Sequence, residues 1–215
     1  MILETRAVEP FFKNGYVLGC ERTREGVLID PGDEVGALLE AVERYTLSIR
    51  YILLTHAHLD HITGVARAKQ AIGAPVGLHR DDLLLYETVV QQGLAFGLRV
   101  DPQPAPDFSY EVGGAPLAFG DYQVRVHHTP GHCPGGVCLQ VGPKAEAGRM
   151  LFVGDTLFAG SIGRTDLPGG DYDTLMRSIR QVLLAFPDNS EVYSGHGPMT
   201  TIGEERRSNP FLRND

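Results

Sequence analysis

Short hydrophobic runs alternate with segments of helical spacing along the first half of the chain. The runs predict strands at Glu4–Phe12, Tyr16–Cys20, Gly26–Ile29, Ile49–Leu54 and Val76–Leu78. Apolar residues that recur every three or four positions predict helices over Glu34–Tyr45, Val65–Ile72 and Asp81–Gly97. The first half therefore combines strands with helices.

The second half follows the proline-rich segment Asp101–Asp107 and repeats this mixture. Strands are predicted at Ala115–Phe119, Tyr122–His127, Val137–Val141, Met150–Val153 and Glu191–Tyr193. One apolar face predicts a helix over Tyr172–Ala185. Strands with interspersed helices favour a layered α/β sandwich, with sheet against sheet and helices outside. We expect a single domain over residues 1–215.

Composition narrows the class of protein. The chain is 42% hydrophobic and 21% charged, which is typical of a globular protein. Its formal net charge is −8 and it has no run of Lys and Arg, which argues against nucleic-acid binding. Three cysteines do not suggest a disulfide framework. No apolar stretch approaches the ~20 residues that cross a bilayer. We therefore expect a cytoplasmic protein without nucleic-acid or membrane partners.

The segment Thr55–His61 has the highest density of candidate metal ligands in the chain. It contains three histidines and one aspartate, directly after a predicted buried strand. Imidazole and carboxylate are ligands for zinc, iron and manganese. His56 and His58 point the same way if this segment is extended, whereas Asp60 and His61 diverge if the chain then turns into a helix. Such a loop can offer two ligands to one ion and two to another.

Three further ligand candidates each follow a predicted strand and stand beside a glycine. They are His132, Asp155 and His196. Taken singly, a histidine after a strand is more often solvated or hydrogen-bonded than bound to metal. Loops at strand ends do converge on one rim, however, so the cluster at Thr55–His61 makes these three residues candidates together.

This order of residues resembles the metallo-β-lactamase superfamily, in its glyoxalase II (hydroxyacylglutathione hydrolase) branch. The resemblance extends from the turn Asp30-Pro31-Gly32 to the segment Glu204–Phe211. It implies an αββα four-layer sandwich, in which two mixed sheets pack face to face with helices outside. The chain runs 19 residues past His196, so we expect a short form without the C-terminal helical domain of the long glyoxalase II enzymes.

The resemblance also implies a role for each ligand candidate. One divalent ion would be held by His56, His58 and His132. A second would be held by Asp60, His61 and His196, and Asp155 would bridge the two. Asp30 would support the segment Thr55–His61, called the metal loop, from below. This role is compatible with the place of Asp30 at the start of a turn. Zinc is the first expectation for both ions, with iron and manganese as alternatives, because these ligands accept several metals.

The reaction implied is two-metal hydrolysis of a small-molecule thioester or ester, of the S-acylglutathione type. A hydroxide that bridges the metals would attack the carbonyl carbon, so no side-chain nucleophile is needed. Asp60 and Asp155 are the candidate catalytic carboxylates, and Asp60 would orient the hydroxide as well as bind metal.

The substrate contacts are less well defined. Arg164 keeps a positive charge where the long glyoxalase II enzymes have a lysine that contacts glutathione, so it is the candidate substrate-binding residue. Asp166 stands where those enzymes have a tyrosine, which weakens the case for glutathione. An ion pair between Arg164 and Asp166 that fixes the loop is the alternative.

Persulfide dioxygenases are the main rival, because they share the fold, the ligand motif and a similar Gly-Arg-Thr-Asp loop. Their single iron would here take His56, His132 and Asp155, a set that suits non-haem Fe(II). The sequence leaves open the metal identity, the oligomeric state and the role of Glu204–Arg207, which is a surface helix, a dimer contact or part of the substrate rim.

Overall fold

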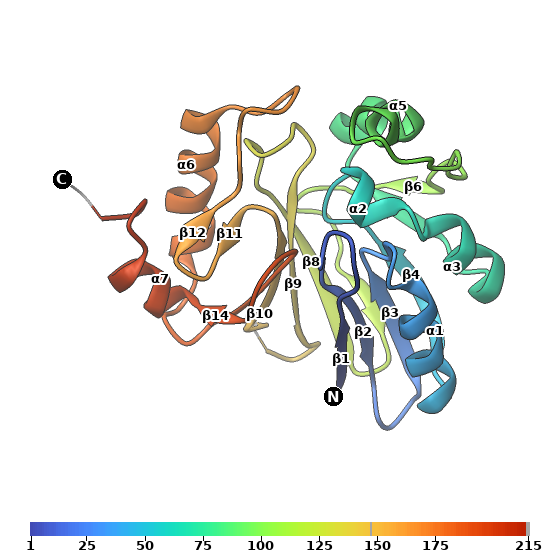
Figure 1. Cartoon of the computed structure of the whole chain (residues 1–215). Helices are drawn as coiled ribbons and strands as arrows, with labels where there is room; N and C mark the ends of the chain where they lie inside the picture. The colour runs from blue at the N-terminus through green and yellow to red at the C-terminus, as the bar shows by residue number, and fades with distance from the viewer. Residues whose placement is uncertain (147, 214–215) are drawn as a thin grey trace. The chain divides into compact units, whose positions relative to one another are not determined.

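The computed structural model describes residues 1–146 and 148–213 (Figure 1). The chain divides into two compact units. The first comprises Met1–Tyr110 and Ala118–Tyr122, and the second comprises Glu111–Leu117 and Gln123–Asp215. The expectation of one domain over residues 1–215 stays a prediction.

A mixed six-stranded sheet forms the centre of the first unit. Its strands lie in the order β1 (Ile2–Arg6), β2 (Gly15–Gly19), β3 (Glu25–Ile29), β4 (Ser48–Leu53), β5 (Val76–Leu78) and β6 (Phe108–Ser109). The first three strands pair antiparallel, and β3 to β6 pair parallel. Parallel pairing directs the carboxyl ends of β3, β4 and β5 to one edge of the sheet, where connecting loops can carry a site.

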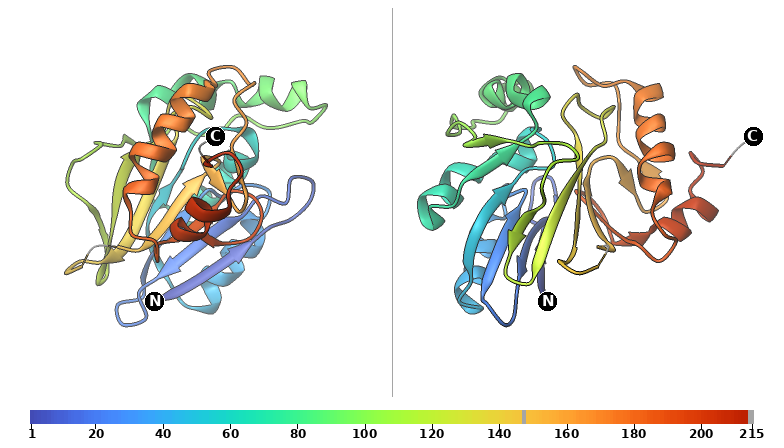
Figure 2. Two further views of the ribbon diagram at one scale, coloured as in Figure 1. Left: turned by 90° about the vertical axis from the view of Figure 1, so that its left-hand side faces the viewer. Right: turned by 180° about the vertical axis from the view of Figure 1, so that it is seen from behind.

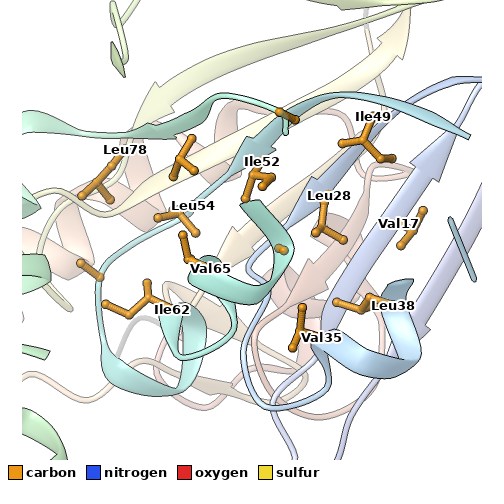
Figure 3. Close-up of a cluster of buried hydrophobic side chains, with 14 of the residues drawn as sticks. Val17, Leu28, Val35, Leu38, Ile49, Ile52, Leu54, Ile62, Val65 and Leu78 are labelled. Atoms are coloured by element: carbon orange, nitrogen blue, oxygen red, sulfur yellow. The ribbon is translucent and has the colours of Figure 1, made fainter. Parts of the chain in front are cut away.

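Helices follow the parallel strands of the first unit. They are α1 (Val35–Arg44), α2 (Leu59–Ile62), α3 (Val65–Ile72), α4 (Leu83–Glu87) and α5 (Val89–Ala95), with a 3-10 turn at Arg80–Asp82. Val35 and Leu38 of α1 and Val65 of α3 are buried against Leu28 and Ile52 of the sheet (Figure 3). These apolar positions recur at helical spacing in the sequence, which is why both helices were predictable.

The predicted strand Glu4–Phe12 is wrong beyond Arg6. Residues 7 to 14 form a loop, in which the N–H of Phe12 donates to the carbonyl of Val8 over 2.9 Å. Pro10 has no N–H to give to a strand, and Phe12 has a left-handed φ of 51° that an extended strand does not allow. The apolar residues of this segment therefore misled the prediction.

The predicted helix Asp81–Gly97 is broken at Thr88. The hydroxyl of Thr88 donates to the carbonyls of Leu84 and Leu85 over 3.0 and 2.9 Å, and α4 ends just before it. Side-chain hydroxyls that bond the preceding turn compete with the backbone ladder of a helix. The chain then starts again as α5, which carries Gln92 toward the metal loop described below.

A second mixed sheet is formed mainly by the second unit, although its residues Ala118, Phe119 and Tyr122 belong to the first. Its order is β14 (Thr200–Thr201), β13 (Glu191–Ser194), β10 (Met150–Gly154), β9 (Val137–Pro143), β8 (Tyr122–His128) and β7 (Leu117–Phe119). β10 pairs parallel with β13 and antiparallel with β9. A separate short hairpin consists of β11 (Leu157–Phe158) and β12 (Ser161–Ile162). The hairpin and β14 carry no clear periodicity, because two-residue strands are too short to show one.

Two helices pack against this second sheet, as Figure 2 shows. They are α6 (Tyr172–Gln181), continued by a 3-10 turn at Leu183–Ala185, and α7 (Ile202–Ser208). Leu175 and Ile179 of α6 are fully buried with Leu151 and Val192 of the sheet. Among the described helices, none combines the length and apolar composition needed to cross a bilayer.

Candidate metal centre

The first unit brings its four ligand candidates together at the carboxyl end of β4. His58 is extended (φ −69°, ψ 150°) and stands just before α2, which carries Asp60 and His61. The rings of His56 and His58 meet edge to face with centroids 4.9 Å apart, and His56 and His61 lie 4.0 Å apart by the same measure. Asp60 Oδ2 and His61 Nε2 are separated by 3.7 Å. The extended conformation of His58 and the turn into α2 after it agree with the conditions on which the sequence analysis based the two ligand pairs.

Three side chains from elsewhere in the first unit fix the backbone of this metal loop. The N–H of Thr55 donates to Asp30 Oδ1 over 2.6 Å. The N–H of Ala57 donates to Asp82 Oδ2 over 3.0 Å, and that of Leu59 to Gln92 Oε1 over 2.9 Å. Every second N–H from residue 55 to 59 is thus held, which leaves the alternate histidines directed together.

Asp82 and Gln92 were missed by the sequence analysis. Gln92 also donates from Nε2 to the carbonyl of Ala57 over 3.1 Å, so it holds the loop through two backbone groups. Asp82 is fully buried. Both residues lie in the segment predicted as one uniform helix, where a polar side chain gives no sign that it turns back toward a loop 25 to 35 residues earlier.

Asp30 connects the metal loop to one of the ligand candidates. Its Oδ2 lies 3.0 Å from His61 Nδ1 and accepts a hydrogen bond from the Thr55 hydroxyl over 2.5 Å. An imidazole that donates from Nδ1 to a carboxylate keeps Nε2 as its lone-pair nitrogen, which is the form a metal binds. Asp30 therefore fixes both the orientation and the tautomer of His61.

Beneath Asp30 lies an ion pair that the sequence analysis did not identify. Lys13 Nζ lies 2.5 Å from Glu34 Oε1 and also donates to the carbonyl oxygen of Asp30. The side chains of Lys13 and Glu34 are 1% and 2% exposed. Glu34 Oε1 also accepts from the N–H of Gly32 over 2.9 Å. The pair ties the turn after β3, which begins with Asp30, to the loop before β2.

We expect Lys13→Met to lower stability strongly, because it leaves the Glu34 carboxylate buried without its cation. Breaking a buried ion pair on one side costs about 3–5 kcal/mol. For a chain of this size each kcal/mol corresponds to about 2–4 °C in Tm. Thermal unfolding followed by circular dichroism measures the change. Lys69→Met is the control, since it removes a more exposed pair with Asp107 and should cost below about 1 kcal/mol. Equal Tm values for the two variants would contradict this role of Lys13.

The second unit brings the other three ligand candidates together. Asp155 directly follows β10, while His132 and His196 follow β8 and β13 within a few residues. His196 Nε2 lies 3.5 Å and His132 Nε2 lies 3.7 Å from Asp155 Oδ2. The neighbouring glycines Gly131, Gly154 and Gly197 have φ values of 129°, 51° and 77°. These left-handed turns let each strand end present its ligand.

These separations have a simple chemical meaning. Ligands ~2.0–2.1 Å from a tetrahedral ion lie about 3.3 Å from each other. The contacts of Asp155 with His132 and His196 are longer than hydrogen bonds and close to that spacing. Imidazole nitrogen and carboxylate oxygen are donors for zinc, iron and manganese. By donor type, and for Asp155 and each of the two histidines also by spacing, these residues fit ligands of a divalent metal.

His132 and Arg164 are joined through the backbone. His132 Nδ1 lies 2.8 Å from the carbonyl oxygen of Arg164. The Arg164 guanidinium makes a two-pronged ion pair with Asp166, with both N···O distances 2.7 Å, and this bonding lowers the pKa of Asp166 to about 2. The ion pair weighed in the sequence analysis is present, and a substrate contact by Arg164 stays a prediction.

Comparison with known proteins identifies close relatives. The family model described as Metallo-beta-lactamase superfamily matches residues 8–196. The hydroxyacylglutathione hydrolase GloC of Haemophilus influenzae is 39% identical over 202 residues, which cover 94% of this chain and 93% of that protein.

Solved structures match the whole fold. The B3 metallo-beta-lactamase BLEG-1 has a TM-score of 0.88 at 37% identity, covering 99% of this chain and 100% of that one. TTHA1623 in a di-iron-bound form has a TM-score of 0.84 at 41% identity, covering 97% and 100%. ETHE1 from Myxococcus xanthus has a TM-score of 0.77 at 29% identity, covering 99% and 84%. The αββα fold class predicted from the sequence is confirmed.

Proposed function

Because this chain belongs to the metallo-beta-lactamase superfamily, a superfamily of metal-binding hydrolases, we propose that it is a binuclear hydrolase of thioesters of the S-acylglutathione type, or of related esters. The observation that carries the proposal is the meeting of imidazole and carboxylate donors within each unit. The similarity to a hydroxyacylglutathione hydrolase over nearly the full length of both proteins supports the choice of substrate class.

In this proposal the two donor sets serve one pair of ions. The first ion would be bound by His56, His58 and His132, the second by Asp60, His61 and His196, and Asp155 would bind both. Two ions use all seven donors, whereas a single ion would leave several strong ligands unused. Zinc is proposed for both positions, with iron or manganese as alternatives, since the same donors suit all three metals.

The chain's own groups bind, orient and hold protons. The carboxylates of Asp60 and Asp155 are 13% and 12% exposed, so competing solvent has limited access to them. They would accept hydrogen bonds from the attacking water and hold it in line with the thioester carbonyl carbon. When bound, the two cations would supply a water of lowered pKa and positive charge for the carbonyl oxygen. Arg164 would meet a substrate carboxylate by exchanging it for Asp166.

The persulfide dioxygenase reaction is the alternative. A single iron held by His56, His132 and Asp155 would have the two-histidine, one-carboxylate set of non-haem iron oxygenases. The 3.7 Å separation of His132 Nε2 and Asp155 Oδ2 suits this set as well. The alternative gives no role to His58, His61 or His196, and the hydrolase is therefore favoured.

Metal analysis with parallel assays tests the proposal. The purified protein, loaded separately with Zn²⁺ and Fe²⁺, is given S-lactoylglutathione, glutathione persulfide or a β-lactam. We expect two metal ions per chain. Among the three substrates, the thioester should be cleaved with the largest kcat/KM, and its cleavage is measured as loss of the thioester absorbance. One iron per chain with oxygen uptake on persulfide would establish the dioxygenase instead. Preferred cleavage of the β-lactam would also overturn the proposed substrate class.

A further inference from the structure

The hairpin β11–β12 lies in the chain between two groups of the candidate metal centre. One residue separates Asp155 from the start of the hairpin, and one residue separates its end from Arg164. Its only cross-strand partners are Leu157 with Ile162 and Phe158 with Ser161. A two-stranded hairpin of this length is not stable by itself. Its position must therefore be set by other parts of the second unit.

Helix α7 and the residue that follows it fix the turn of this hairpin. Glu205 Oε2 accepts from the N–H of Gly160 over 2.9 Å. Asn209 Nδ2 donates to the carbonyl of Ser161 over 3.0 Å and to Glu205 Oε2 over 2.8 Å. Glu205 Oε1 also accepts from the hydroxyl of Thr200 over 2.6 Å. Figure 1 shows α7, β14 and the hairpin side by side, as these bonds require.

The side chains of Glu205 and Asn209 are both buried, so their hydrogen bonds have no competition from solvent. Glu205 is 1% exposed and Asn209 is 0% exposed. A buried carboxylate is tolerated only when hydrogen bonds compensate for lost hydration, and Glu205 has three such donors. Glu204 and Arg207 of the same helix are exposed and pair with each other at 3.1 Å. The segment Glu204–Arg207 is therefore a surface helix with one inward-facing acid.

The far end of the hairpin contacts a ligand candidate. The N–H of Gly163 donates to the carbonyl of Thr156 over 3.3 Å, and a Cβ atom on Gly163 would overlap the carbonyl oxygen of Asp155. The next carbonyl, that of Arg164, lies 2.8 Å from His132 Nδ1. A backbone carbonyl at Nδ1 fixes the ring orientation and reserves Nε2 for a metal. Only one residue separates the hairpin from this carbonyl.

We propose that Glu205 and Asn209 are positioning residues of the metal centre, which hold the β11–β12 hairpin so that the Arg164 carbonyl orients His132. The proposal rests on the proposed function for the presence of a metal, and it assigns α7 a role in metal affinity. The contacts run from Glu205 and Asn209 to the hairpin turn, and from the hairpin end to His132. All of them lie within the second unit.

The test compares metal release from four variants. Glu205→Ala removes the acceptor of three donors, and Asn209→Ala removes the bond to Ser161 while leaving Glu205 in place. Glu205→Gln is the conservative variant, because its amide oxygen still accepts from Gly160. Glu204→Ala is the matched control, because it changes an exposed acid one residue away. Release of Zn²⁺ to a chelator is timed, and the absorption spectrum of the Co²⁺ form is recorded, at a temperature where circular dichroism shows native protein.

We expect release of one of the two ions to become about 10–100-fold faster in Glu205→Ala and Asn209→Ala, the range typical of residues that support a metal ligand. The Co²⁺ spectrum should change with it, while Glu205→Gln stays close to the wild type and Glu204→Ala is unchanged. If Glu205→Ala does not fold, Asn209→Ala carries the test.

Several results would overturn this role. If Glu205 and Asn209 only stabilised the fold, their alanine variants would have a lower Tm. The metal release rate and the Co²⁺ spectrum of the folded variants would then be unaltered. Equal acceleration in the Glu204→Ala control would also exclude a specific contact. A wild-type protein that binds no metal would overturn both proposals. A wild type that binds two ions without cleaving thioesters would overturn only the proposed function, since the release experiment is independent of turnover.

Discussion

An Asp155→Ala variant is expected to lose most of its bound metal and to cleave thioesters at least about 10³-fold more slowly than the wild type, equivalent to about 4 kcal/mol in the activation barrier. The reason is the place of this carboxylate, whose Oδ2 lies within 3.7 Å of the Nε2 atoms of both His132 and His196. Without the Asp155 carboxylate, each imidazole lacks the negatively charged ligand with which it would bind a cation. Metal content per chain and kcat/KM measure the two effects.

Asp155→Asn serves as the matched comparison for that experiment. It keeps the volume of the side chain and one oxygen donor but removes the charge. We expect intermediate metal content, because an amide oxygen is a weaker ligand than a carboxylate for these ions. Asp173, an exposed acid in the first turn of α6, gives a control in Asp173→Asn that should behave like the wild type. Two metals per chain with full turnover in Asp155→Ala would refute the bridging role.

Asp30→Asn is expected to abolish metal binding through His61 while the protein stays folded. The N–H of Thr55 requires an oxygen where Oδ1 now stands, so the amide oxygen takes that place. The amide nitrogen then faces His61 Nδ1, at the position of Oδ2. Because an amide N–H only donates, Nδ1 must accept, and the ring proton moves to Nε2. That tautomer cannot bind a metal through Nε2.

The expected readout for Asp30→Asn is one metal per chain instead of two, with kcat lower by about 10²-fold, the upper end of the range for groups that support a ligand. Nitrogen chemical shifts of the His61 ring, measured by NMR on the metal-free protein, report the tautomer directly. Asp33→Asn is the control, since Asp33 is exposed and bonds only the Thr63 hydroxyl among the contacts described for its side chain. An unchanged tautomer with two metals bound would exclude this mechanism.

The ligand candidates could be predicted from the sequence because their signal is local. Four of them lie within six residues, from His56 to His61, and the other three stand beside glycines at predicted strand ends. The helix Val65–Ile72 was predicted with its observed bounds, since Gly73 has a φ of 74° and ends it as such glycines do.

The supporting residues could not be predicted, because their partners are distant in the chain. Lys13 bonds Glu34 21 residues later, and Asn209 bonds Ser161 48 residues earlier. A lysine next to two phenylalanines gives no indication that its ammonium group is buried, and a helix of seven residues gives no indication that its second acid faces inward. Periodicity describes which face of an element is apolar, whereas these roles depend on which polar group lies opposite.

The three side chains that hold the backbone of residues 55 to 59 have a consequence for the metal-free protein. Asp30, Asp82 and Gln92 bond the loop backbone directly, through protein groups alone. The loss of conformational entropy in this loop then occurs during folding rather than at metal capture. The apoprotein should accordingly take up its first cation rapidly, without a slow rearrangement, and keep the same loop conformation before and after.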